Sequence, residues 1–448
     1  MPNDLPPPAP DRDLPRLTQL QQPIQQQLQQ HIQQQPQHRI TFADYMDRAL
    51  YQPGGYYHQA PGIGPNVGPN LGSGGPTAGD FITSPHLCAD FGELLAIQLL
   101  EMWEHLGRPQ PFQIVEMGAG HGLLAVDILR YLLREAPQLA RDDRPENSLD
   151  YRIIERSPSL QNSQRQQLQA SGLPPSLIQA IRWHTWEDLP HESITGCFLS
   201  NELIDAFPVH LVEVAATSAA PGSPGEQEPG LGGQGPGEQG QARCLKEVYV
   251  TWDGDRFSPI LGELSDPALA DYFAAFAFGL EQYPIGYRTE INLAARAWID
   301  QVANKLARGY CLTIDYGYTA ERYYQPSRRG GTLQCYFQHS HHNDPFTHVG
   351  QQDITAHVNF TALEQWGTAA GLESLGFTQQ GLFLMALGLG DRLQALATEA
   401  TDIRAIQQMI QRREQLHQLI NPMGLGNFGI LIQAKGLSPA ARALPLQG

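Results

Sequence analysis

The sequence predicts an α/β protein with a doubly wound, mainly parallel sheet. Short apolar runs that suit strands alternate with helical patterns over most of the chain. One of these runs ends in a glycine-rich turn that leads directly into a helical pattern. Two strand-like runs near the C-terminus indicate one antiparallel strand at that edge of the sheet. With 448 residues, the chain is long enough to bury a large core.

The individual elements follow from the spacing of apolar residues. Strands are expected at 112–117, 151–155, 181–184, 196–200, 310–315, 377–387 and 428–434. Helices are expected at 123–135, 158–170, 289–307 and 360–370, with a helical insertion at about 262–285 and a long amphipathic run at 391–418. An N-terminal helix is expected near 40–50, where Thr41 can cap the first turn.

Low-complexity segments interrupt this pattern. Residues 1–38 are rich in proline and then in glutamine, which predicts a disordered or loosely helical tail without a core-forming face. The folded domain is expected at 39–438, with a flexible tail at 439–448. Gly/Pro-rich stretches at about 59–79 and 217–243 suit solvent loops lengthened by insertion. The second stretch separates two strand-like runs and is expected to connect a hairpin.

Composition excludes several classes of protein. The net charge of −17 disfavours nucleic-acid binding, because an acidic chain repels phosphate. The five cysteines are scattered and never paired as C-x-x-C, which predicts reduced thiols in a cytosol-like compartment. No run of eighteen apolar residues occurs, so no membrane insertion is expected. The N-terminus does not resemble a secretory signal, and the cytoplasm is the expected location.

The segment at 112–122 predicts a cofactor site. A strand ends in Glu116, and Gly118, Gly120 and Gly122 recur at alternate positions before a helix. Glycine permits unusual φ values and lets a ligand lie against bare backbone. An ordinary strand-to-helix turn is the alternative interpretation.

The spacing of this turn distinguishes between cofactors. A dinucleotide fingerprint has G-x-G-x-x-G, whereas Leu123 stands where its last glycine would be. Glu155 ends the next strand, where a carboxylate can accept both ribose hydroxyls of a nucleoside. Together these features favour S-adenosylmethionine over NAD. A solvated Glu155, or one paired with Arg156, remains the alternative for that acid.

Several blocks resemble the MidA family, relatives of the mitochondrial complex I assembly methyltransferases that act on protein arginine. The blocks lie at 79–85 (Gly-Asp-Phe-Ile-Thr-Ser-Pro), 91–93, 116–122, 155–158, 200–209 (Ser-Asn-Glu-Leu-Ile-Asp-Ala-Phe-Pro-Val), 315–317, 352–358 and 422–428. The resemblance covers roughly 40–435 and implies a seven-stranded class I methyltransferase (Rossmann-like) sheet that binds S-adenosylmethionine. Its mitochondrial members imply arginine methylation of a respiratory-complex subunit. The block at 422–428 has Gly-Leu-Gly where the family has Gly-Met-Gly.

The block at 79–85 contributes three further cofactor candidates. Ser84 suits an N-cap with Pro85 at the first helical position. Asp80, Thr83 and Ser84 would then cluster at a helix N-terminus, whose free N–H groups can hold the cofactor's carboxylate. Plain helix capping is the alternative.

The block at 200–209 contributes the catalytic candidates Asn201, Glu202 and Asp205. They follow a buried strand beside the glycine motif, where the acceptor should meet the methyl group. Carboxylates can accept bidentately from a guanidinium, and Glu202 and Asp205 share a face if the segment is helical. One carboxylate could also take the proton lost on transfer. Local capping is the alternative, and Asp315 suits either the acceptor cleft or a structural role.

Histidines do not predict a metal site. His339, His341, His342, His348 and His357 lie in or near a polar interval without a helical histidine pair or a cysteine partner.

The predicted function is methyl transfer to a protein arginine, with a respiratory-complex subunit as the partner. The alternatives are an assembly factor that acts mainly by binding its partner, and a small-molecule methyltransferase or NAD-dependent enzyme. The acceptor protein and the oligomeric state stay open.

Overall fold

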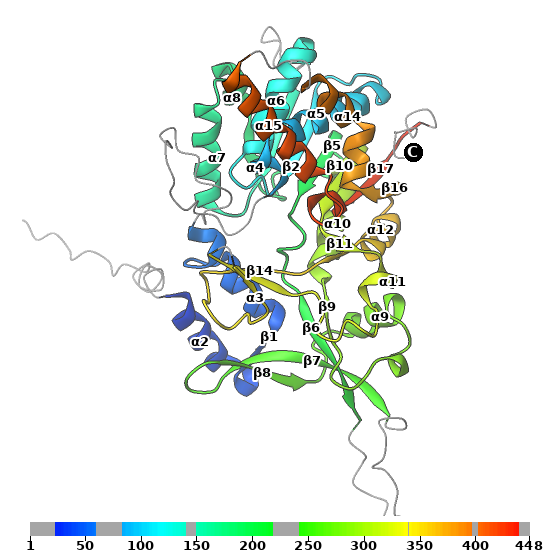
Figure 1. Cartoon of the computed structure of the whole chain (residues 1–448). Coiled ribbons are helices and arrows are strands. Elements are labelled where there is room, and N and C mark those ends of the chain that lie inside the picture. The colour runs from blue at the N-terminus through cyan, green and yellow to red at the C-terminus, as the bar shows by residue number, and fades with distance from the viewer. Residues whose placement is uncertain are drawn as a thin grey trace, which may run out of the picture.

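A seven-stranded sheet forms the centre of the computed structural model, which describes residues 23–59, 83–139, 149–217, 242–338, 340–396 and 402–438. The strands, in spatial order, are β16 (Glu373–Gln379), β17 (Gly429–Lys435), β10 (Leu306–Asp315), β5 (Ile194–Asn201), β2 (Phe112–Met117), β3 (Leu149–Ile154) and β4 (Arg182–His184) (Figure 1). From β10 to β4 all neighbours are parallel, whereas β17 is antiparallel to β10 and β16. The predicted α/β class and its reversed C-terminal strand are confirmed, with β16 as the edge outside β17.

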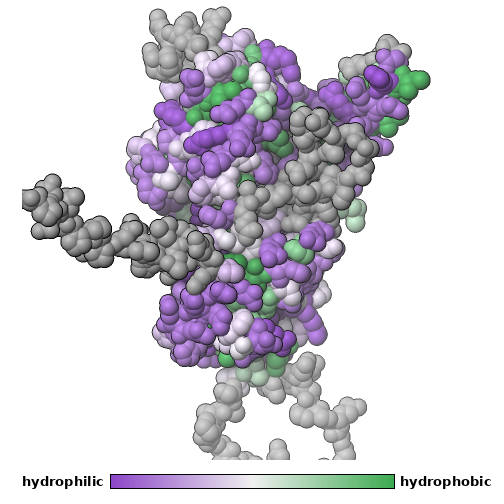
Figure 2. All heavy atoms as spheres, turned by 90° about the vertical axis from the view of Figure 1, so that its left-hand side faces the viewer, coloured by the Kyte–Doolittle hydropathy of each residue, from purple (hydrophilic) through white to green (hydrophobic). Residues whose placement is uncertain are grey.

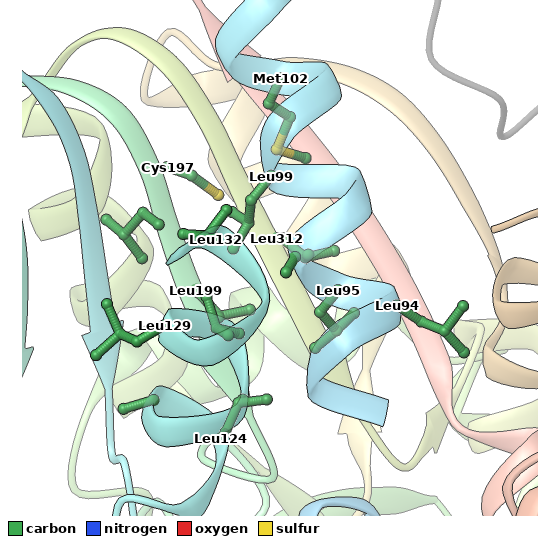
Figure 3. Close-up of a cluster of buried hydrophobic side chains, with 14 of the residues drawn as sticks. Leu94, Leu95, Leu99, Met102, Leu124, Leu129, Leu132, Cys197, Leu199 and Leu312 are labelled. Carbon is green, nitrogen blue, oxygen red and sulfur yellow. The ribbon is translucent and has the colours of Figure 1, made fainter. Parts of the chain in front are cut away.

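Helices cover both faces of this sheet because its strands are apolar on both sides. On one face lie α5 (Ala89–His105) and α6 (Leu123–Glu135), and on the other α10 (Leu293–Lys305) and α12 (Phe360–Ala369). Figure 3 shows leucines of α5 and α6 packed against Cys197, Leu199 and Leu312 of β5 and β10. On the opposite side, Phe198 and Cys311 from the same strands face α10 and α12.

A second sheet, made of β1 and of strands that follow β5 in the chain, lies beyond the carboxyl ends of the first (Figure 1). Its strands are β1 (Arg39–Thr41), β6 (His210–Ala216), β7 (Arg243–Trp252), β8 (Phe257–Gly262) and β9 (Arg288–Ile291). β6 and β7 are antiparallel, so the predicted hairpin is confirmed, although 218–241 lies outside the described residues. Helices α2 (Ile24–Gln34) and α3 (Phe42–Tyr51) pack on this sheet in one core cluster, and α9 (Pro267–Phe276) packs on it in another.

Further elements complete the described part of the fold. Its other α-helices are α4 (Ser84–Leu87), α7 (Pro158–Ala170), α8 (Pro175–Ala180), α11 (Ala320–Tyr323), α13 (Gln380–Ala386), α14 (Leu389–Leu396) and α15 (Ile403–Leu419). The remaining strands are β11 (Gly317–Tyr318), β12 (Gln334–Phe337), β13 (Ser340–His342), β14 (Asp353–Thr355) and β15 (Val358–Asn359).

The glutamine tract is partly folded, which corrects the prediction of a disordered or loosely helical tail without a core-forming face at 1–38. Residues 24–34 form α2, in which Ile24, Leu28 and Ile32 are buried against α3 and the second sheet. Apolar residues spaced by four fall on one helical face, so the tract does have a core-forming side. Residues 1–22, the loop at 60–82 and the tail at 439–448 lie outside the described residues.

Two segments, each predicted as a single element, contain a strand followed by a helix. The predicted helix at 289–307 begins as β9, because 288–291 pairs with β6, and Asn292 then caps α10. The predicted strand at 377–387 ends at Gln379 and continues as α13, where Gln380, Phe383 and Leu384 are buried at helical spacing. The amphipathic run at 391–418 comprises α14 and α15, with 397–401 outside the described residues.

The predicted cap of the N-terminal helix is confirmed. Thr41 caps α3 and accepts a hydrogen bond from the backbone N–H of Asp44 at 3.1 Å. All five cysteines are free. In the described ranges, no helix is long and apolar enough to cross a bilayer. The face of the molecule in Figure 2 is largely hydrophilic, with scattered apolar patches.

Candidate functional site

The glycine turn after β2 adopts the backbone conformation that the sequence predicts. Gly118, Gly120 and Gly122 have φ values of 68°, 52° and 83°, which favour glycine. A Cβ on Gly118 would lie 2.6 Å from Cδ1 of Leu203, whereas one on Gly120 would meet no atom within 4 Å. Gly120 therefore presents bare backbone to open space, and Gly122 is the N-cap of α6.

This open space forms a cleft beside the glycine turn. We call it the glycine-turn cleft. Its walls come from the turn itself, the ends of β2, β3 and β5, the start of α4, and the N-terminal α3 region. The residues that line it are Tyr51, Tyr57, Thr83, Pro85, His86, Glu116, Gly118, Ala119, Gly120, His121, Leu123, Leu124, Glu155, Leu160, Asn201, Glu202, Leu203, Asp205 and Ala206.

The two acids at the strand ends both line the cleft. The Tyr151 hydroxyl donates to Oε2 of Glu116 at 2.7 Å, and burial raises the pKa of Glu116 to about 7. Glu155 accepts from the backbone N–H of Ser157 at 2.8 Å, and burial raises its pKa. Arg156 pairs with Asp47 at 2.7 Å, so its ion pair with Glu155 does not form. Glu155 is thus held in a fixed orientation at the cleft.

The segment before α4 differs from the prediction. Thr83, not Ser84, occupies the N-cap position. The Ser84 hydroxyl donates to Oε1 of Gln380 at 3.3 Å. The backbone N–H of Ser84 favours the ionised form of Glu202. Thr83 lines the cleft, and Asp80 lies outside the described residues.

Asn201, Glu202 and Asp205 come together in a turn rather than on a helix face. Glu202 has a φ of 49°, uncommon for a residue with a side chain, and its N–H donates to the carbonyl of Ile314 at 2.9 Å. The Asn201 side-chain amide donates to Oε1 of Glu202 at 3.1 Å. Among the described residues, Oδ1 of Asn201 and Oδ1 of Asp205 are buried without a hydrogen-bond partner.

Glu202 and Asp205 form what we call the acid pair. Burial and the neighbouring Asp205 charge raise the pKa of Glu202 to about 8. Burial likewise raises the pKa of Asp205 to about 6. Near neutral pH, Glu202 therefore holds its proton and Asp205 is mostly ionised, and a cation placed between them would favour the ionised form of both.

Asp315 fixes the turn that carries the acid pair. Its Oδ2 accepts from the backbone N–H groups of Leu203, Ile204 and Asp205 at 3.2, 2.9 and 3.3 Å. Asp315 is fully buried and lines neither cavity at the acid pair. Of its two predicted roles, the geometry favours the structural one.

A second cavity of about 890 Å³ adjoins the first and shares the acid pair with it. We call it the aromatic cavity. The Tyr316 hydroxyl forms a hydrogen bond with Asp205. His357 stacks on Tyr318 with ring centroids 4.9 Å apart, and burial lowers its pKa to about 4, so its ring is neutral. The residues that line this cavity are Glu202, Asp205, Tyr316, Gly317, Tyr318, Gln334, Tyr336, Thr355, His357, Met423, Gly424, Asn427 and Phe428.

Several cleft residues gave no functional signal in the sequence. Tyr51 and Tyr57 reach the cleft from the N-terminal region, where only the helix pattern was informative. His121 lies inside the glycine motif, which could have indicated it, and its Nδ1 lies 2.6 Å from Oγ of Ser163. No group of three or more His, Cys, Asp or Glu side chains in the described ranges could hold a metal ion.

The cleft suits a nucleoside cofactor with a charged tail. The open space above Gly120 admits a ligand against the backbone, and Glu155 stands where ribose hydroxyls can be bound. A match to the family described as "Putative S-adenosyl-L-methionine-dependent methyltransferase" spans residues 94–378. The chain belongs to the MidA family of S-adenosylmethionine-dependent methyltransferases.

Mitochondrial relatives match most of this chain at low identity. The mitochondrial protein arginine methyltransferase NDUFAF7 homolog of Drosophila melanogaster is 26% identical over 393 residues, 81% of this chain and 74% of that protein. The mitochondrial protein arginine methyltransferase NDUFAF7 of Rattus norvegicus is 27% identical over 410 residues, 86% of this chain and 79% of that protein.

A solved MidA-type structure from Burkholderia thailandensis is more similar. It is 30% identical, has a TM-score of 0.72, covers 98% of both chains, and contains S-adenosyl-homocysteine. The cofactor of this chain is S-adenosylmethionine, as predicted. When bound, its sulfonium supplies an electrophilic methyl group. Glu116, Gly118, Gly120 and Glu155 all line the glycine-turn cleft, and they remain the residues predicted to hold the cofactor.

Proposed function

We propose that this MidA protein transfers a methyl group to an arginine side chain of a protein. The acid pair supports the proposal, because it is shared by both cavities and could contact a group that enters from the aromatic side. A guanidinium is a planar cation with five donors, and adjacent carboxylates match it. Asp205 Oδ1, buried and unpartnered among the described residues, leaves one acceptor for such a donor.

The acid pair also suits the proton balance of the reaction. Methyl transfer to a guanidinium nitrogen would form an N–C bond while the S–CH3 bond of the donor breaks and S-adenosyl-homocysteine leaves. One N–H proton is released, since the methylated guanidinium remains a cation. An ionised Glu202 or Asp205 can accept this proton, because raised pKa values make both carboxyls effective bases near neutral pH. Correct placement of the nitrogen supplies much of the remaining acceleration.

A subunit of a respiratory NADH-dehydrogenase-like complex is the proposed acceptor, acted on during assembly. The support is the low-identity similarity to mitochondrial arginine methyltransferases. An assembly factor with little catalysis fits less well, because the glycine turn and both strand-end acids retain a cofactor-binding geometry. Location in the cytoplasm remains a prediction.

Mass spectrometry tests the proposal directly. The purified protein is incubated with methyl-labelled S-adenosylmethionine and with proteins from cells that lack its gene. Label on arginine, foremost in a subunit of an NADH-dehydrogenase-like complex, is expected. Glu202→Gln serves as the control and should yield little label. Label confined to other residue types or to small molecules would contradict arginine as the acceptor.

A further inference from the structure

Gln164, on α7, is buried behind the wall of the glycine-turn cleft. The residue is 0% exposed, and it is not among the residues that line the cleft. Its Nε2 donates to the backbone carbonyl of Gly120 at 2.9 Å and to Oε2 of Glu155 at 3.1 Å. One side-chain amide therefore joins the glycine turn after β2 to the acid that follows β3.

The partners of Gln164 fix the direction in which its amide points. Nε1 of Trp183, on β4, donates to Oε1 of Gln164 at 2.8 Å. An indole N–H can only donate, whereas a backbone carbonyl and an ionised carboxylate can only accept. If the amide were turned over, its NH2 group would face the indole donor and its oxygen would face the two acceptors. The three hydrogen bonds of this side chain therefore agree with one orientation only.

Glu155 is held on both of its carboxylate oxygens. Its Oε1 accepts from the backbone N–H of Ser157 at 2.8 Å, and its Oε2 accepts from Gln164. An ionised carboxylate offers about four acceptor positions, so Glu155 keeps acceptor positions beyond these two bonds. Glu155 lines the cleft, where such positions can accept from the hydroxyls of a ribose.

The bond from Gln164 also acts on the charge of Glu155. Burial raises the pKa of this carboxyl, whereas the N–H donors of Ser157 and Gln164 act in the opposite direction. Donors favour the ionised form, which is the form that accepts from two hydroxyls at once. Without the amide of Gln164, Glu155 should keep its proton up to a higher pH.

We propose that Gln164 is a positioning residue of the cofactor site, which holds the glycine turn and Glu155 together so that Glu155 accepts the ribose hydroxyls of S-adenosylmethionine. Gln164 lies behind the cleft wall, so it acts through Gly120 and Glu155 and not by touching the cofactor. The inference builds on the predicted role of Glu155 and does not depend on which group accepts the methyl.

Two ligands test the inference by calorimetry with the purified protein, namely S-adenosyl-homocysteine and its 2′-deoxyribose analogue. The wild type should bind the analogue about tenfold more weakly, because Glu155 loses a hydroxyl donor. We call this ratio of affinities the ribose preference. In Gln164→Leu, S-adenosyl-homocysteine should bind about tenfold more weakly, and the ribose preference should fall to about twofold or less.

The pH dependence of binding gives a second measurement. The affinity for S-adenosyl-homocysteine should fall as the pH is lowered, because Glu155 takes up a proton and loses acceptor positions. In Gln164→Leu this fall should occur at higher pH than in the wild type, because one donor to the ionised carboxylate is missing. A role of Gln164 in stability alone would change neither the ribose preference nor the midpoint of this fall.

A second variant covers the case in which Gln164→Leu does not fold. Gln164→Glu keeps the size of the side chain and an acceptor for Trp183, but it lacks both amide donors. Its carboxylate would also repel that of Glu155. We expect the ribose preference of Gln164→Glu to be lost at mildly alkaline pH, where both carboxyls are ionised.

Gln113→Leu and Gln113→Glu are the matched controls. Gln113 is also a buried glutamine, and it lines neither cavity. Its Nε2 donates to Oδ2 of Asp150 at 3.3 Å, and its Oε1 accepts from the backbone N–H of Thr195 at 2.7 Å. Both controls should keep the ribose preference even where their melting temperature falls.

The outcomes separate a positioning role of Gln164 from a structural one. A ribose preference that survives in Gln164→Leu or in Gln164→Glu overturns the positioning role, and so does an equal loss in the Gln113 controls. A wild type that binds both ligands equally overturns the role of Glu155 and the inference with it. None of these measurements involves an acceptor, so failure here would leave arginine methylation standing, and failure of arginine methylation would leave this inference standing.

Discussion

The glycine-turn cleft and the aromatic cavity share the acid pair, yet they are assembled from different kinds of segment. The cleft is built mainly at the ends of β2, β3 and β5, which are neighbours in one parallel sheet. The aromatic cavity takes its wall from four separate regions between Tyr316 and Phe428. A regular sheet thus forms the cleft for the cofactor, whereas irregular segments form the cavity proposed for the acceptor. Proteins of one fold commonly differ in substrate through such irregular segments.

Glu202→Gln should give the largest difference between its effect on methyl transfer and its effect on cofactor binding. It removes a carboxylate that faces both, and we expect methyl transfer to fall by about 100-fold to 1000-fold. The affinity for S-adenosyl-homocysteine, measured by calorimetry, should change little, because the glycine turn and Glu155 remain. Glu213→Gln on β6 is the control, since Glu213 pairs with Arg288 outside both cavities. If S-adenosyl-homocysteine binding and methyl transfer fell by the same factor, Glu202 would act in cofactor binding alone.

Gly120→Ala tests the cleft without touching the aromatic cavity. Gly120 and Gly172 have φ values of 52° and 76°, and a Cβ on either would meet no atom within 4 Å. Alanine at either position should therefore cost about 1 kcal/mol of stability, measured by thermal unfolding. Only Gly120 faces the cleft, so only Gly120→Ala should weaken S-adenosyl-homocysteine binding, by about tenfold or more. Equal affinities in the two variants would remove Gly120 from the cofactor site.

Tyr316→Phe tests the smallest effect, on the acceptor side. A carboxyl whose pKa is raised binds a cation only after losing its proton, so affinity for an arginine peptide should rise with pH through about 6 and about 8. The Tyr316 hydroxyl bond favours the ionised form of Asp205. Its removal should move the lower inflection to higher pH, with affinity at neutral pH reduced about threefold. A shift to lower pH would contradict this role.

Sequence reasoning succeeded where chemistry follows from local order. The turn at 118–122, α6 and α7 match the predicted ranges, because glycine spacing and apolar periodicity determine them within a few residues. The acid at the end of β3 was placed correctly for the same reason.

The sequence did not predict contacts between residues that are far apart in the chain. The sequence around Ser84 does not predict that its backbone N–H favours the ionised form of Glu202. Likewise, the sequence at 280–295 does not predict that Thr289 belongs to β9, which pairs with β6. Tyr51 and His357 reach their cavities from segments far away in the chain. Such contacts depend on tertiary packing, which overrides local propensity.

Helix α2 fixes the register of the glutamine tract, because its apolar residues must stay on the buried face of the helix. Its buried residues Ile24, Leu28 and Ile32 recur every four positions with glutamines and one histidine between them. One added glutamine after Leu28 would rotate everything beyond it by about 100°, turning the buried face of Ile32 toward solvent. Repeats of one residue commonly tolerate changes in length when they are solvated. In this tract a single-residue change in length would move Ile32 off the buried face. We therefore expect such a change to disrupt the packing of α2 against the second sheet.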